Sequence, residues 1–406
     1  MAVSECFHLG TADDVRDLLA WAVAEETPLE IVGAGTKRGF GHAVDARHSV
    51  DLSTLSGIVD YEPAELVLTA RAATPVAEIE ALLRQSNQQL AFEPPDLGPL
   101  LGAAPEKATL GGILAANLSG PRRVLTGAAR DHALGVEVAT GRGELIKAGG
   151  RVVKNVTGYD LTKLMCGSWG TLGIMTQVSV KVLPAAEKTR TVLISGLSAS
   201  AASSVMAEAL SSPHEVTAAA YLPEAVTAHS SVAYISGAGS SITAIRVEGP
   251  PVSVSVRNAA LRELMAPHGE IEELHGHNSG RFWQEVRDVA PLIGEGDAIW
   301  RLAVPPASGG SVLDQLGNHA IDGFLDWSGG LVWCAAPADA VNAATIRTLA
   351  DETGGHAMLV RAPDVLKAEV PVFHPQPETR AGLTRRIKEG FDPAGILNPG
   401  RMTGMV

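Results

Sequence analysis

The chain has 406 residues, a length that usually folds into two or three domains. Apolar residues make up 46% of it and charged residues 19%, which provides for a large core and excludes extensive disorder. The formal net charge of −13 argues against binding to nucleic acid and against simple electrostatic docking on anionic lipid, because both need a basic surface.

The three cysteines, Cys6, Cys166 and Cys334, lie far apart in the sequence and form no CxxC pair. An iron–sulfur cluster requires about four thiolates, so we expect no cluster, no other metal site and no disulfide framework. The N-terminus lacks the apolar stretch of a signal peptide, and no apolar run approaches the roughly 18 residues of a membrane span. We therefore expect a cytoplasmic protein that would reach the inner membrane only peripherally, through a partner.

The first glycine-rich loop follows a predicted strand. Residues 11–14 are typical of a helix start, and residues 29–32 predict a short strand that runs into Gly33-Ala34-Gly35-Thr36-Lys37. Consecutive backbone amides at a strand end form a nest for phosphate oxygens, to which Lys37 adds charge. The loop is neither a Rossmann nor a Walker A motif, and taken alone it is equally consistent with an ordinary turn.

The next segments predict strands at 49–52, 57–61 and 66–70, then a helix that starts at Thr74-Pro75. A rigid loop at 92–96, which contains Pro95 and Asp96, either lines a pocket or only ends a strand. These short elements indicate the first part of an α+β domain.

A second glycine-rich segment precedes an apolar run. Thr109-Leu110-Gly111-Gly112 stands directly before residues 113–118, which predicts a helix N-terminus with Thr109 as its cap and with bare N–H groups. Such an end attracts phosphate, although similar turns occur in proteins without a cofactor. Because two such segments occur in one domain, we interpret them as converging on the diphosphate of a flavin.

The remainder of this domain predicts a hairpin at 136–147, a short helix at 161–165 and a strand at 174–182, with Pro184 at its end. From residue 188 the glycine loops give way to alternating strands and helices. Repeated β-α-β units with antiparallel returns predict a ferredoxin-like α+β cap.

The order of these motifs resembles a known family. IVGAGTK, ATLGGILAANLSG and GRVVKNVTGYDLTKLMCGSWGTLGI are similar to the FAD domain of the vanillyl-alcohol oxidase/p-cresol methylhydroxylase (PCMH) type, and FDPAGILNPGR at 391–401 resembles the end signature of its lactate and glycolate dehydrogenase branch. GGRVVKNVTGYDLTKL and GGHAMLVRAP are most similar to an FAD-binding subunit of bacterial glycolate oxidase. The resemblance implies an α+β fold with a two-subdomain PCMH-type FAD-binding domain at 1–186, a ferredoxin-like cap domain at 187–375 and a C-terminal segment at 376–406 that returns to the FAD domain.

The same resemblance implies the residues that bind FAD, position by position. Gly33, Ala34, Gly35, Thr36 and Lys37 match the diphosphate loop, and Thr109, Leu110, Gly111 and Gly112 match the second phosphate and ribityl contact, with Asn117 and Gly120 beside it. Pro95 and Asp96 match a loop near the flavin ring, and Gly173 and Ile174 match a strand near the adenine. Phe40 and His42 lie near where a linking residue could sit, but we expect the FAD to be non-covalent.

Oxidation of a 2-hydroxy acid needs a base for the hydroxyl proton and a cation for the carboxylate. The candidates are Arg281, Arg301, His356 and Arg361, followed by Arg287 and His374. Each of these residues is also typical of a surface ion pair or of a hydrogen-bonded structural histidine, so the catalytic residues stay unassigned. The paired-histidine motif HxGDGNxH expected in a sister subunit is missing, and His275-Gly276-His277, its nearest counterpart, is predicted to be a loop.

The sequence therefore predicts the FAD-binding subunit of a glycolate oxidase or dehydrogenase complex. The resemblance implies a sister FAD subunit and an iron–sulfur subunit that receives electrons from the oxidation of glycolate to glyoxylate. Two alternatives remain: a self-sufficient 2-hydroxy acid dehydrogenase of the D-lactate type, and a non-catalytic flavin-binding assembly or relay subunit. A nicotinamide cofactor on a Rossmann unit is disfavoured, because no amphipathic helix with a suitably spaced acidic residue follows the first loop.

Overall fold

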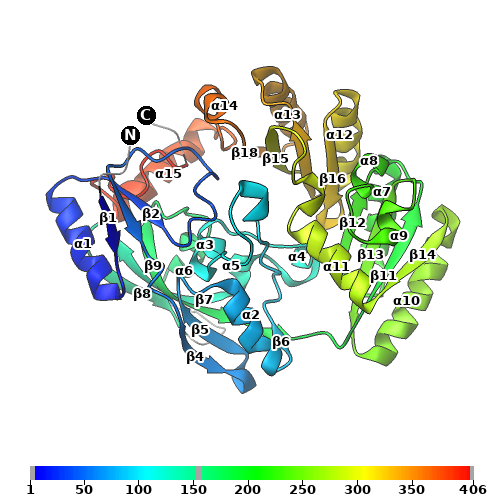
Figure 1. Cartoon of the computed structure of the whole chain (residues 1–406), viewed down its shortest axis with the longest axis horizontal. Coiled ribbons are helices and arrows are strands. Elements are labelled where there is room, and N and C mark those ends of the chain that lie inside the picture. The colour runs from blue at the N-terminus through cyan, green and yellow to red at the C-terminus, as the bar shows by residue number, and fades with distance from the viewer. Residues whose placement is uncertain (1–4, 151–157, 403–406) are drawn as a thin grey trace. The chain divides into compact units, whose positions relative to one another are not determined.

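The computed structural model describes residues 5–150 and 158–402, and it divides the chain into two compact units. Unit 1 comprises Met1–Leu118, Ala128–Pro184 and Pro375–Val406, and unit 2 comprises Ser119–Gly127 and Ala185–His374. Both units combine helices with strands, which confirms the α+β class (Figure 1). Residues 151–157 of the GGRVVKNVTGYDLTKL motif lie outside the described residues.

The first sheet of unit 1 is parallel, with strand order β1-β3-β2. Its strands are β1 (Glu5–His8), β2 (Leu29–Val32) and β3 (His48–Asp51). Helix α1 (Ala12–Ala24) starts at Thr11, whose hydroxyl accepts the Asp14 N–H while the Asp14 carboxylate accepts the Thr11 N–H. The predicted helix start and the predicted strand before the glycine loop are both present.

The second sheet of unit 1 is antiparallel, with strand order β4-β5-β9-β7-β8. Its strands are β4 (Ile58–Glu62), β5 (Val67–Arg71), β7 (Ala133–Thr140), β8 (Leu145–Gly149) and β9 (Gly173–Lys181). The other elements of unit 1 are β6 (Gln88–Gln89), β10 (Leu183–Pro184), α2 (Val76–Gln85), α3 (Leu110–Ala115), α5 (Ala129–His132), α6 (Leu161–Met165) and α15 (Glu378–Phe391).

Unit 2 contains two consecutive β-α-β-β-α-β repeats. The first consists of β11 (Lys188–Ser195), α7 (Ala199–Ser211), β12 (Val216–Leu222), β13 (Ile242–Gly249), α10 (Pro251–Met265) and β14 (Ile271–His275). The second consists of β15 (Ala298–Ala303), α12 (Pro306–Asn318), β16 (Asp322–Asp326), β17 (Leu331–Ala336), α13 (Ala340–Glu352) and β18 (His356–Arg361).

The two repeats join into one eight-stranded sheet of order β14-β11-β13-β12-β16-β17-β15-β18. Within each repeat the fourth strand lies beside the first and the third beside the second, which is the ferredoxin-like arrangement. The predicted ferredoxin-like cap is therefore present, as a tandem pair of such repeats. Its shorter helices are α4 (Arg123–Thr126), α8 (Glu224–Thr227), α9 (Ala233–Ser236), α11 (Gly276–Arg287) and α14 (Asp364–Glu369).

The two faces of this sheet differ in character. Trp300 and Leu302 of β15 belong to the hydrophobic core that includes residues of α7, α12 and α13. Since successive side chains of a strand point to opposite faces, Arg301 and its cross-strand partner Trp333 lie on the other face, as do Arg246 and Glu248 of β13. Charged and aromatic side chains thus gather on the face opposite the long helices.

Helices α11 and α12 of unit 2 differ from the sequence-based expectation. The segment 275–277 does not form a loop, since β14 ends at His275 and α11 begins at Gly276. Helix α12 has no counterpart among the predicted elements, and its Gly309 and Gly310 are residues that favour turns over helix interiors. A Cβ at Gly309 would lie 2.0 Å from the Gly329 carbonyl oxygen, so these glycines allow close backbone packing instead.

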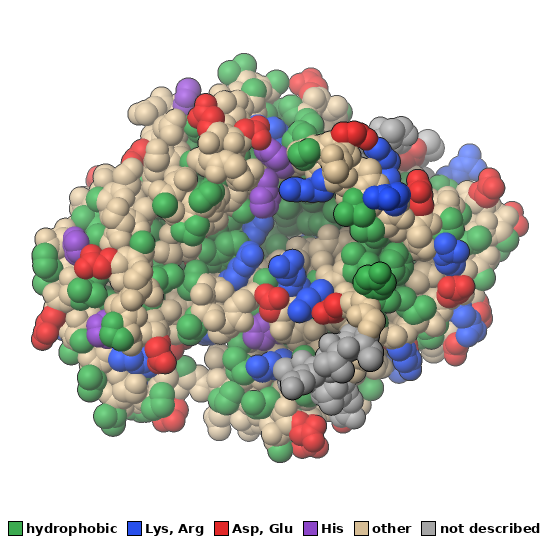
Figure 2. All heavy atoms as spheres, turned by 180° about the vertical axis from the view of Figure 1, so that it is seen from behind, with side chains coloured by type: hydrophobic (Ala, Val, Ile, Leu, Met, Phe, Trp, Pro, Cys, Tyr) green, Lys and Arg blue, Asp and Glu red, His purple; other side chains and the backbone are tan. Residues whose placement is uncertain are grey.

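Acidic side chains are dispersed over the face of the molecule that Figure 2 draws. Figure 2 shows Asp and Glu side chains scattered over one face of the molecule and interspersed with Lys and Arg. Among the described helices, none combines the length and the hydropathy needed to span a bilayer.

Candidate functional site

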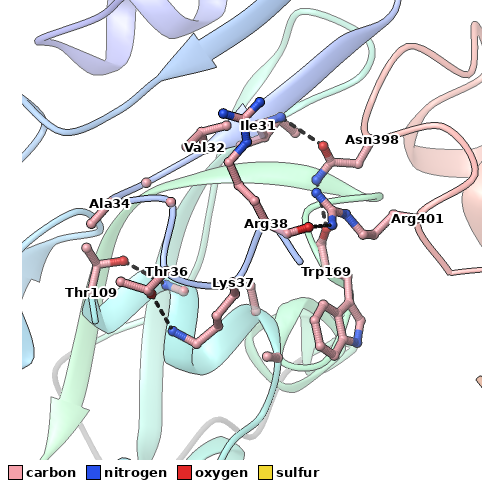
Figure 3. A pocket seen from close by; sticks show the side chains of 15 residues that line it. Ile31, Val32, Ala34, Thr36, Lys37, Arg38, Thr109, Trp169, Asn398 and Arg401 are labelled. Atoms are coloured by element: carbon pink, nitrogen blue, oxygen red, sulfur yellow. Dashed lines mark hydrogen bonds between the residues drawn. The ribbon is translucent and has the colours of Figure 1, made fainter. Parts of the chain in front are cut away.

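A pocket in unit 1 lies at the end of strand β2 (Figure 3). It brings the first glycine loop together with the start of α3 and with the C-terminal segment, although these segments are far apart in the sequence. Its lining residues are Ile31, Val32, Gly33, Ala34, Gly35, Thr36, Lys37, Arg38, Thr109, Gly112, Ala115, Ala116, Trp169, Asn398 and Arg401.

The loop Gly33–Lys37 supplies a run of available donors. Within residues 5–150 and 158–402, none of the five backbone N–H groups of this loop donates a hydrogen bond to the protein. Gly35 has a φ of +72°, a left-handed conformation that glycine adopts without steric cost. Consecutive unpaired amides at the end of a strand form the nest that binds phosphate oxygens.

Lys37 adds a cation to this nest. Its side chain is partly buried, and its ammonium nitrogen lies 3.4 Å from the Thr36 hydroxyl. Burial lowers the pKa of Lys37 to about 8, and the nearby Asp96 carboxylate opposes this shift only in part. An anion bound in the pocket would therefore meet a poorly solvated ammonium group, which is a strong electrostatic partner.

The start of α3 differs from the expected run of bare amides. The Leu110 N–H donates to the Thr74 carbonyl at 3.0 Å, and the Gly111 N–H donates to the Ala72 carbonyl at 2.7 Å. The Gly112 N–H donates to the Thr109 hydroxyl at 3.2 Å, which confirms Thr109 as the N-cap. The expectation of free donors at this helix end is wrong, because segment 72–74 accepts the bonds that a phosphate would have taken.

Thr109 and Gly112 nevertheless line the pocket, and the two glycine segments do converge. A Cβ at Gly33 would lie 3.2 Å from the Thr109 hydroxyl oxygen, and one at Gly112 would lie 3.6 Å from the Lys37 ammonium nitrogen. Gly112 therefore leaves room beside Lys37 for a ligand. Leu110 and Gly111 are buried and do not line the pocket, unlike their neighbours Thr109 and Gly112.

Two side chains of the C-terminal segment, Asn398 and Arg401, line the pocket and hydrogen-bond to the segments around it. The Asn398 side-chain oxygen accepts the Ile31 N–H at 2.8 Å, and its amide nitrogen donates to the Trp169 carbonyl at 2.9 Å. Arg401 donates to the carbonyl oxygens of Arg38 and Phe40 at 2.9 and 3.0 Å. Asn398 and Arg401 both belong to the sequence LNPGR at 397–401. The resemblance of this sequence to a family signature was the only feature of the sequence that indicated a role for these two residues.

The other predicted cofactor residues lie outside this pocket. Asp96 accepts the N–H groups of Gly98 and Glu106, and Asn117 accepts the Arg130 N–H at 3.1 Å. The Gly120 carbonyl, in unit 2, accepts the Trp327 indole N–H at 3.0 Å. The pocket lining does not include Pro95, Gly173 or Ile174 either. A Cβ at Gly173 would lie 2.4 Å from a Val138 methyl carbon, so this glycine allows close packing of the strands.

Of the four catalytic candidates, three have environments typical of surface or structural residues. Arg281 is exposed and donates to the Ser231 hydroxyl at 2.6 Å. Arg361 donates to the Glu295 and Gly296 carbonyls at 3.0 and 2.9 Å, and burial lowers its pKa. His356 is exposed at the start of β18.

Arg301 has a different environment on the charged face of the unit 2 sheet. Its guanidinium carbon lies 5.1 Å from the Trp327 ring centroid and 6.0 Å from that of Trp333, and Arg123 lies 4.1 Å from the Trp327 centroid. Burial and the charge of Arg123 lower the pKa of Arg301 to about 10, against the opposing effect of Asp326. Two guanidinium groups that share one indole ring form a site suited to an organic anion.

Comparison with known proteins gives the family. Residues 6–149 match the family described as an FAD binding domain. The chain is 35% identical over 384 residues to glycolate oxidase subunit GlcE of Escherichia coli strain K12, and the match covers 94% of both chains. The chain belongs to the GlcE family. This GlcE-family chain is an FAD-linked oxidoreductase, and its cofactor is FAD.

A second relative and a solved structure extend the comparison. The GlcE-family chain is 34% identical over 182 residues to glycolate oxidase subunit GlcD of Bacillus subtilis, which covers 45% of this chain and 37% of GlcD. The crystal structure of p-cresol methylhydroxylase with substrate bound superposes with a TM-score of 0.72 at 14% identity, over 98% of this chain and 88% of that one. This likeness confirms the predicted PCMH-type fold.

Proposed function

We propose that this chain is the FAD-binding subunit of a glycolate oxidase complex. The observation that carries the proposal is the pocket at the end of β2, where Lys37 and five amides without a partner among the described residues face a common space. In this proposal unit 1 is the FAD-binding domain and unit 2 is the cap. Similarity to GlcE over nearly the whole chain supports the choice of complex.

Gly33 to Lys37 would hold the FAD diphosphate, while Thr109 and Gly112 would form the facing wall. Asn398 would keep the loop in place through Ile31 and Trp169. We propose a non-covalent cofactor, since Phe40, which stands near a position where a linking residue could sit, is fully buried with its ring centroid 4.7 Å from that of Trp169. The unpaired amides of the loop and the Lys37 ammonium group are the donors that a diphosphate requires.

For the substrate we propose a small 2-hydroxy acid, glycolate, with glyoxylate as product. Arg301 and Arg123 would bind its carboxylate, because a guanidinium pairs with a carboxylate through two parallel hydrogen bonds. Bound FAD supplies the two-electron chemistry of the oxidation. The residues of this chain would orient the substrate carboxylate and keep water away from it.

For the partners we propose a sister FAD subunit and an iron–sulfur subunit that receives the electrons. The similarity of this chain to both GlcE and GlcD supports a complex with two related flavoprotein subunits. Membrane association, in this proposal, is peripheral and depends on the complex.

The decisive experiment measures flavin reduction by glycolate and D-lactate under anaerobic conditions. We expect the purified chain to carry FAD and to stay oxidised, and the assembled complex to reduce its flavin. Bleaching of the isolated chain would establish a self-sufficient dehydrogenase instead. Normal turnover by a complex whose copy of this chain has lost FAD through Gly112→Glu would identify a non-catalytic assembly role.

The proposed carboxylate site is tested in the complex with Arg301→Met. Loss of a charge-assisted hydrogen bond costs about 1.5–3 kcal/mol, so we expect KM for glycolate to rise about tenfold to a hundredfold at unchanged FAD content. Arg281→Met is the matched control, since Arg281 is exposed on α11. An unchanged KM in the Arg301 variant would refute the assignment.

A further inference from the structure

Three side chains with metal-binding chemistry meet at the outer face of the first sheet in unit 1. The thiol of Cys6, an imidazole nitrogen of His8 and a carboxylate oxygen of Asp51 all lie within 4.8 Å of one another. Cys6 and His8 are exposed, and Asp51 is partly buried. None of the three lines the pocket at the end of β2, so the cluster is separate from the proposed FAD site.

The register of β1 on β3 produces this arrangement. The strands are parallel, with Cys6 opposite Ser49 and His8 opposite Asp51. Alternation along β1 points Phe7 to the other face, where its ring centroid lies 5.6 Å from that of Trp21 in α1. Cys6 and His8 therefore share one face although they are separated from Asp51 by more than forty positions, which is why the sequence alone did not predict the cluster.

Hydrogen bonds hold Asp51 and the end of β1 next to His8 in place. One oxygen of the Asp51 carboxylate accepts the Ser53 N–H at 2.8 Å, which leaves the other oxygen 3.1 Å from His8 Nδ1. The Leu9 N–H donates to the Asp51 carbonyl at 3.2 Å, and the Thr54 hydroxyl donates to the Leu9 carbonyl at 2.8 Å. A carboxylate that is oriented by a hydrogen bond to its second oxygen is a typical feature of metal sites.

We propose that Cys6, His8 and Asp51 bind a divalent transition metal ion of the zinc class. Thiolate, imidazole and carboxylate are the three ligand types of Zn²⁺ in proteins, at distances of about 2.0–2.3 Å. Ligand atoms around a tetrahedral ion are then roughly 3–4 Å apart by the same bond lengths. Small rotations of the exposed Cys6 and His8 side chains bring the present spacing to that value.

The fourth position of the ion faces solvent and takes a water molecule, as in zinc sites with three protein ligands. The preference for this class over Mg²⁺ or Ca²⁺ follows from the thiolate and the imidazole, which hard cations bind poorly. Bound metal joins β1 to β3, so it stabilises the N-terminal strand of unit 1.

The test uses untagged, FAD-loaded full-length protein that has been treated with a chelator and then titrated with Co²⁺ as the optical probe. We expect one equivalent to bind with a thiolate-to-cobalt charge-transfer band in the near ultraviolet, and Zn²⁺ to displace it. Cys166 and Cys334 are buried, so the band reports on Cys6. Absence of a thiolate band in the wild-type titration would overturn the proposal.

Two variants and one control locate the site. Cys6→Ser should abolish the charge-transfer band, and both Cys6→Ser and His8→Gln should weaken Co²⁺ binding at least tenfold, with FAD content unchanged. The matched control is His268→Gln, because His268 Nε2 also pairs with a carboxylate, Glu208, at 2.9 Å but is not part of a three-ligand group. Equal affinity in the wild type and the two β1 variants would refute the assignment, as would a loss of affinity in the control.

Discussion

Lys37 is the residue whose charge state most directly controls the pocket. Burial lowers its pKa to about 8, while the same side chain in an unfolded chain titrates near 10.5. Between these two values the unfolded chain binds more protons than the folded one, so the contribution of Lys37 to the stability of the FAD-free protein improves as pH rises from about 8 to 10.5. At neutral pH the buried, protonated Lys37 therefore lowers the stability of the FAD-free protein, and it places a cation in the loop.

Lys37 makes FAD binding dependent on pH. The diphosphate favours the protonated ammonium, so the dissociation constant of FAD should increase as pH rises above about 8, where the FAD-free protein loses this proton. We expect Lys37→Met to weaken binding about tenfold or more at pH 7, from the loss of a charge-assisted hydrogen bond worth roughly 1.5–3 kcal/mol. Flavin fluorescence titrations from pH 7 to 9 measure both effects.

The control is the same pH series on the Lys37→Met protein, whose FAD affinity should be nearly constant in this range. A wild-type dissociation constant that does not change between pH 7 and 9, or a variant that retains the full pH dependence, would contradict the role assigned to Lys37.

At the scale of the element, the start of α3 shows two adjacent glycines with different tasks. A Cβ at Gly111 would lie 2.8 Å from the Ala72 carbonyl oxygen, whereas one at Gly112 would lie 3.0 Å from the Thr109 hydroxyl oxygen and 3.6 Å from the Lys37 ammonium nitrogen, two side chains that line the pocket. Gly111 therefore permits close packing of the helix on segment 72–74, and Gly112 permits close approach of a ligand.

The same substitution at the two glycines should have different effects. Gly111→Ala should destabilise unit 1 by about 1–3 kcal/mol, because it overpacks a contact with backbone. Gly112→Ala should lower the melting temperature of the FAD-free protein less than Gly111→Ala does, because its 3.0 Å contact is with the Thr109 side chain rather than with backbone, but it should weaken FAD binding. Thermal melts of FAD-free protein and FAD titrations measure the two effects, and each variant is the control for the other. Equal losses of stability in both would contradict this division.

The elements also show how far the sequence can be interpreted. Strand β2 with its glycine loop and the capped start of α3 were predictable, because Thr109 and the glycines have strong local preferences. The hydrogen-bond partners of the α3 amides were not predictable, because the carbonyl groups of Ala72 and Thr74 come close to these amides only through the tertiary fold. Helix α12 was not predicted either. Its Gly309 packs closely against the backbone of Gly329, and nothing in the neighbouring sequence indicates this long-range contact.

Asn398 illustrates the same limit at the pocket. Its side chain bonds Ile31 and Trp169, which are 367 and 229 positions away in the sequence. We expect Asn398→Ala to lower the stability of unit 1 by about 1–3 kcal/mol, because the Ile31 N–H loses its partner, and to weaken FAD binding by loosening the loop. Chemical denaturation and FAD titration measure this, with Asn342→Ala on α13 as the control. Wild-type values for both quantities in Asn398→Ala would show that the C-terminal segment does not support the loop.

At the scale of the whole molecule, each unit has a hydrophobic core of its own. One core in unit 1 contains Val15, Leu19 and Ile396, and two in unit 2 lie beneath the helices of the tandem repeats. Units with separate cores usually unfold in separate transitions. Calorimetry should therefore resolve two transitions, and FAD should raise the temperature of the one that belongs to unit 1.

Glu248 allows the unit 2 transition to be identified independently. Burial alone would raise the pKa of Glu248, but the guanidinium groups of Arg246 and Arg122 outweigh this effect and lower the pKa to about 2. Arg122 bonds both carboxylate oxygens, at 3.0 and 3.1 Å. The stabilisation by this group is complete above pH 4.5, the ordinary value, and is lost as pH falls toward 2.

Glu248→Gln should destabilise unit 2 by about 3–5 kcal/mol, because two buried guanidinium groups lose their counter-ion. At roughly 2–4 °C per kcal/mol for a domain of this size, the corresponding transition should move down by about 6–20 °C. The transition that FAD raises should stay in place, and the acid sensitivity of the unit 2 transition between pH 4.5 and 2 should diminish. Glu208→Gln, which removes a partly exposed carboxylate of unit 2, should change neither transition. A single transition that shifts as a whole in Glu248→Gln would mean that the two units unfold cooperatively, and the interpretation of separate cores as separate folding units would be wrong.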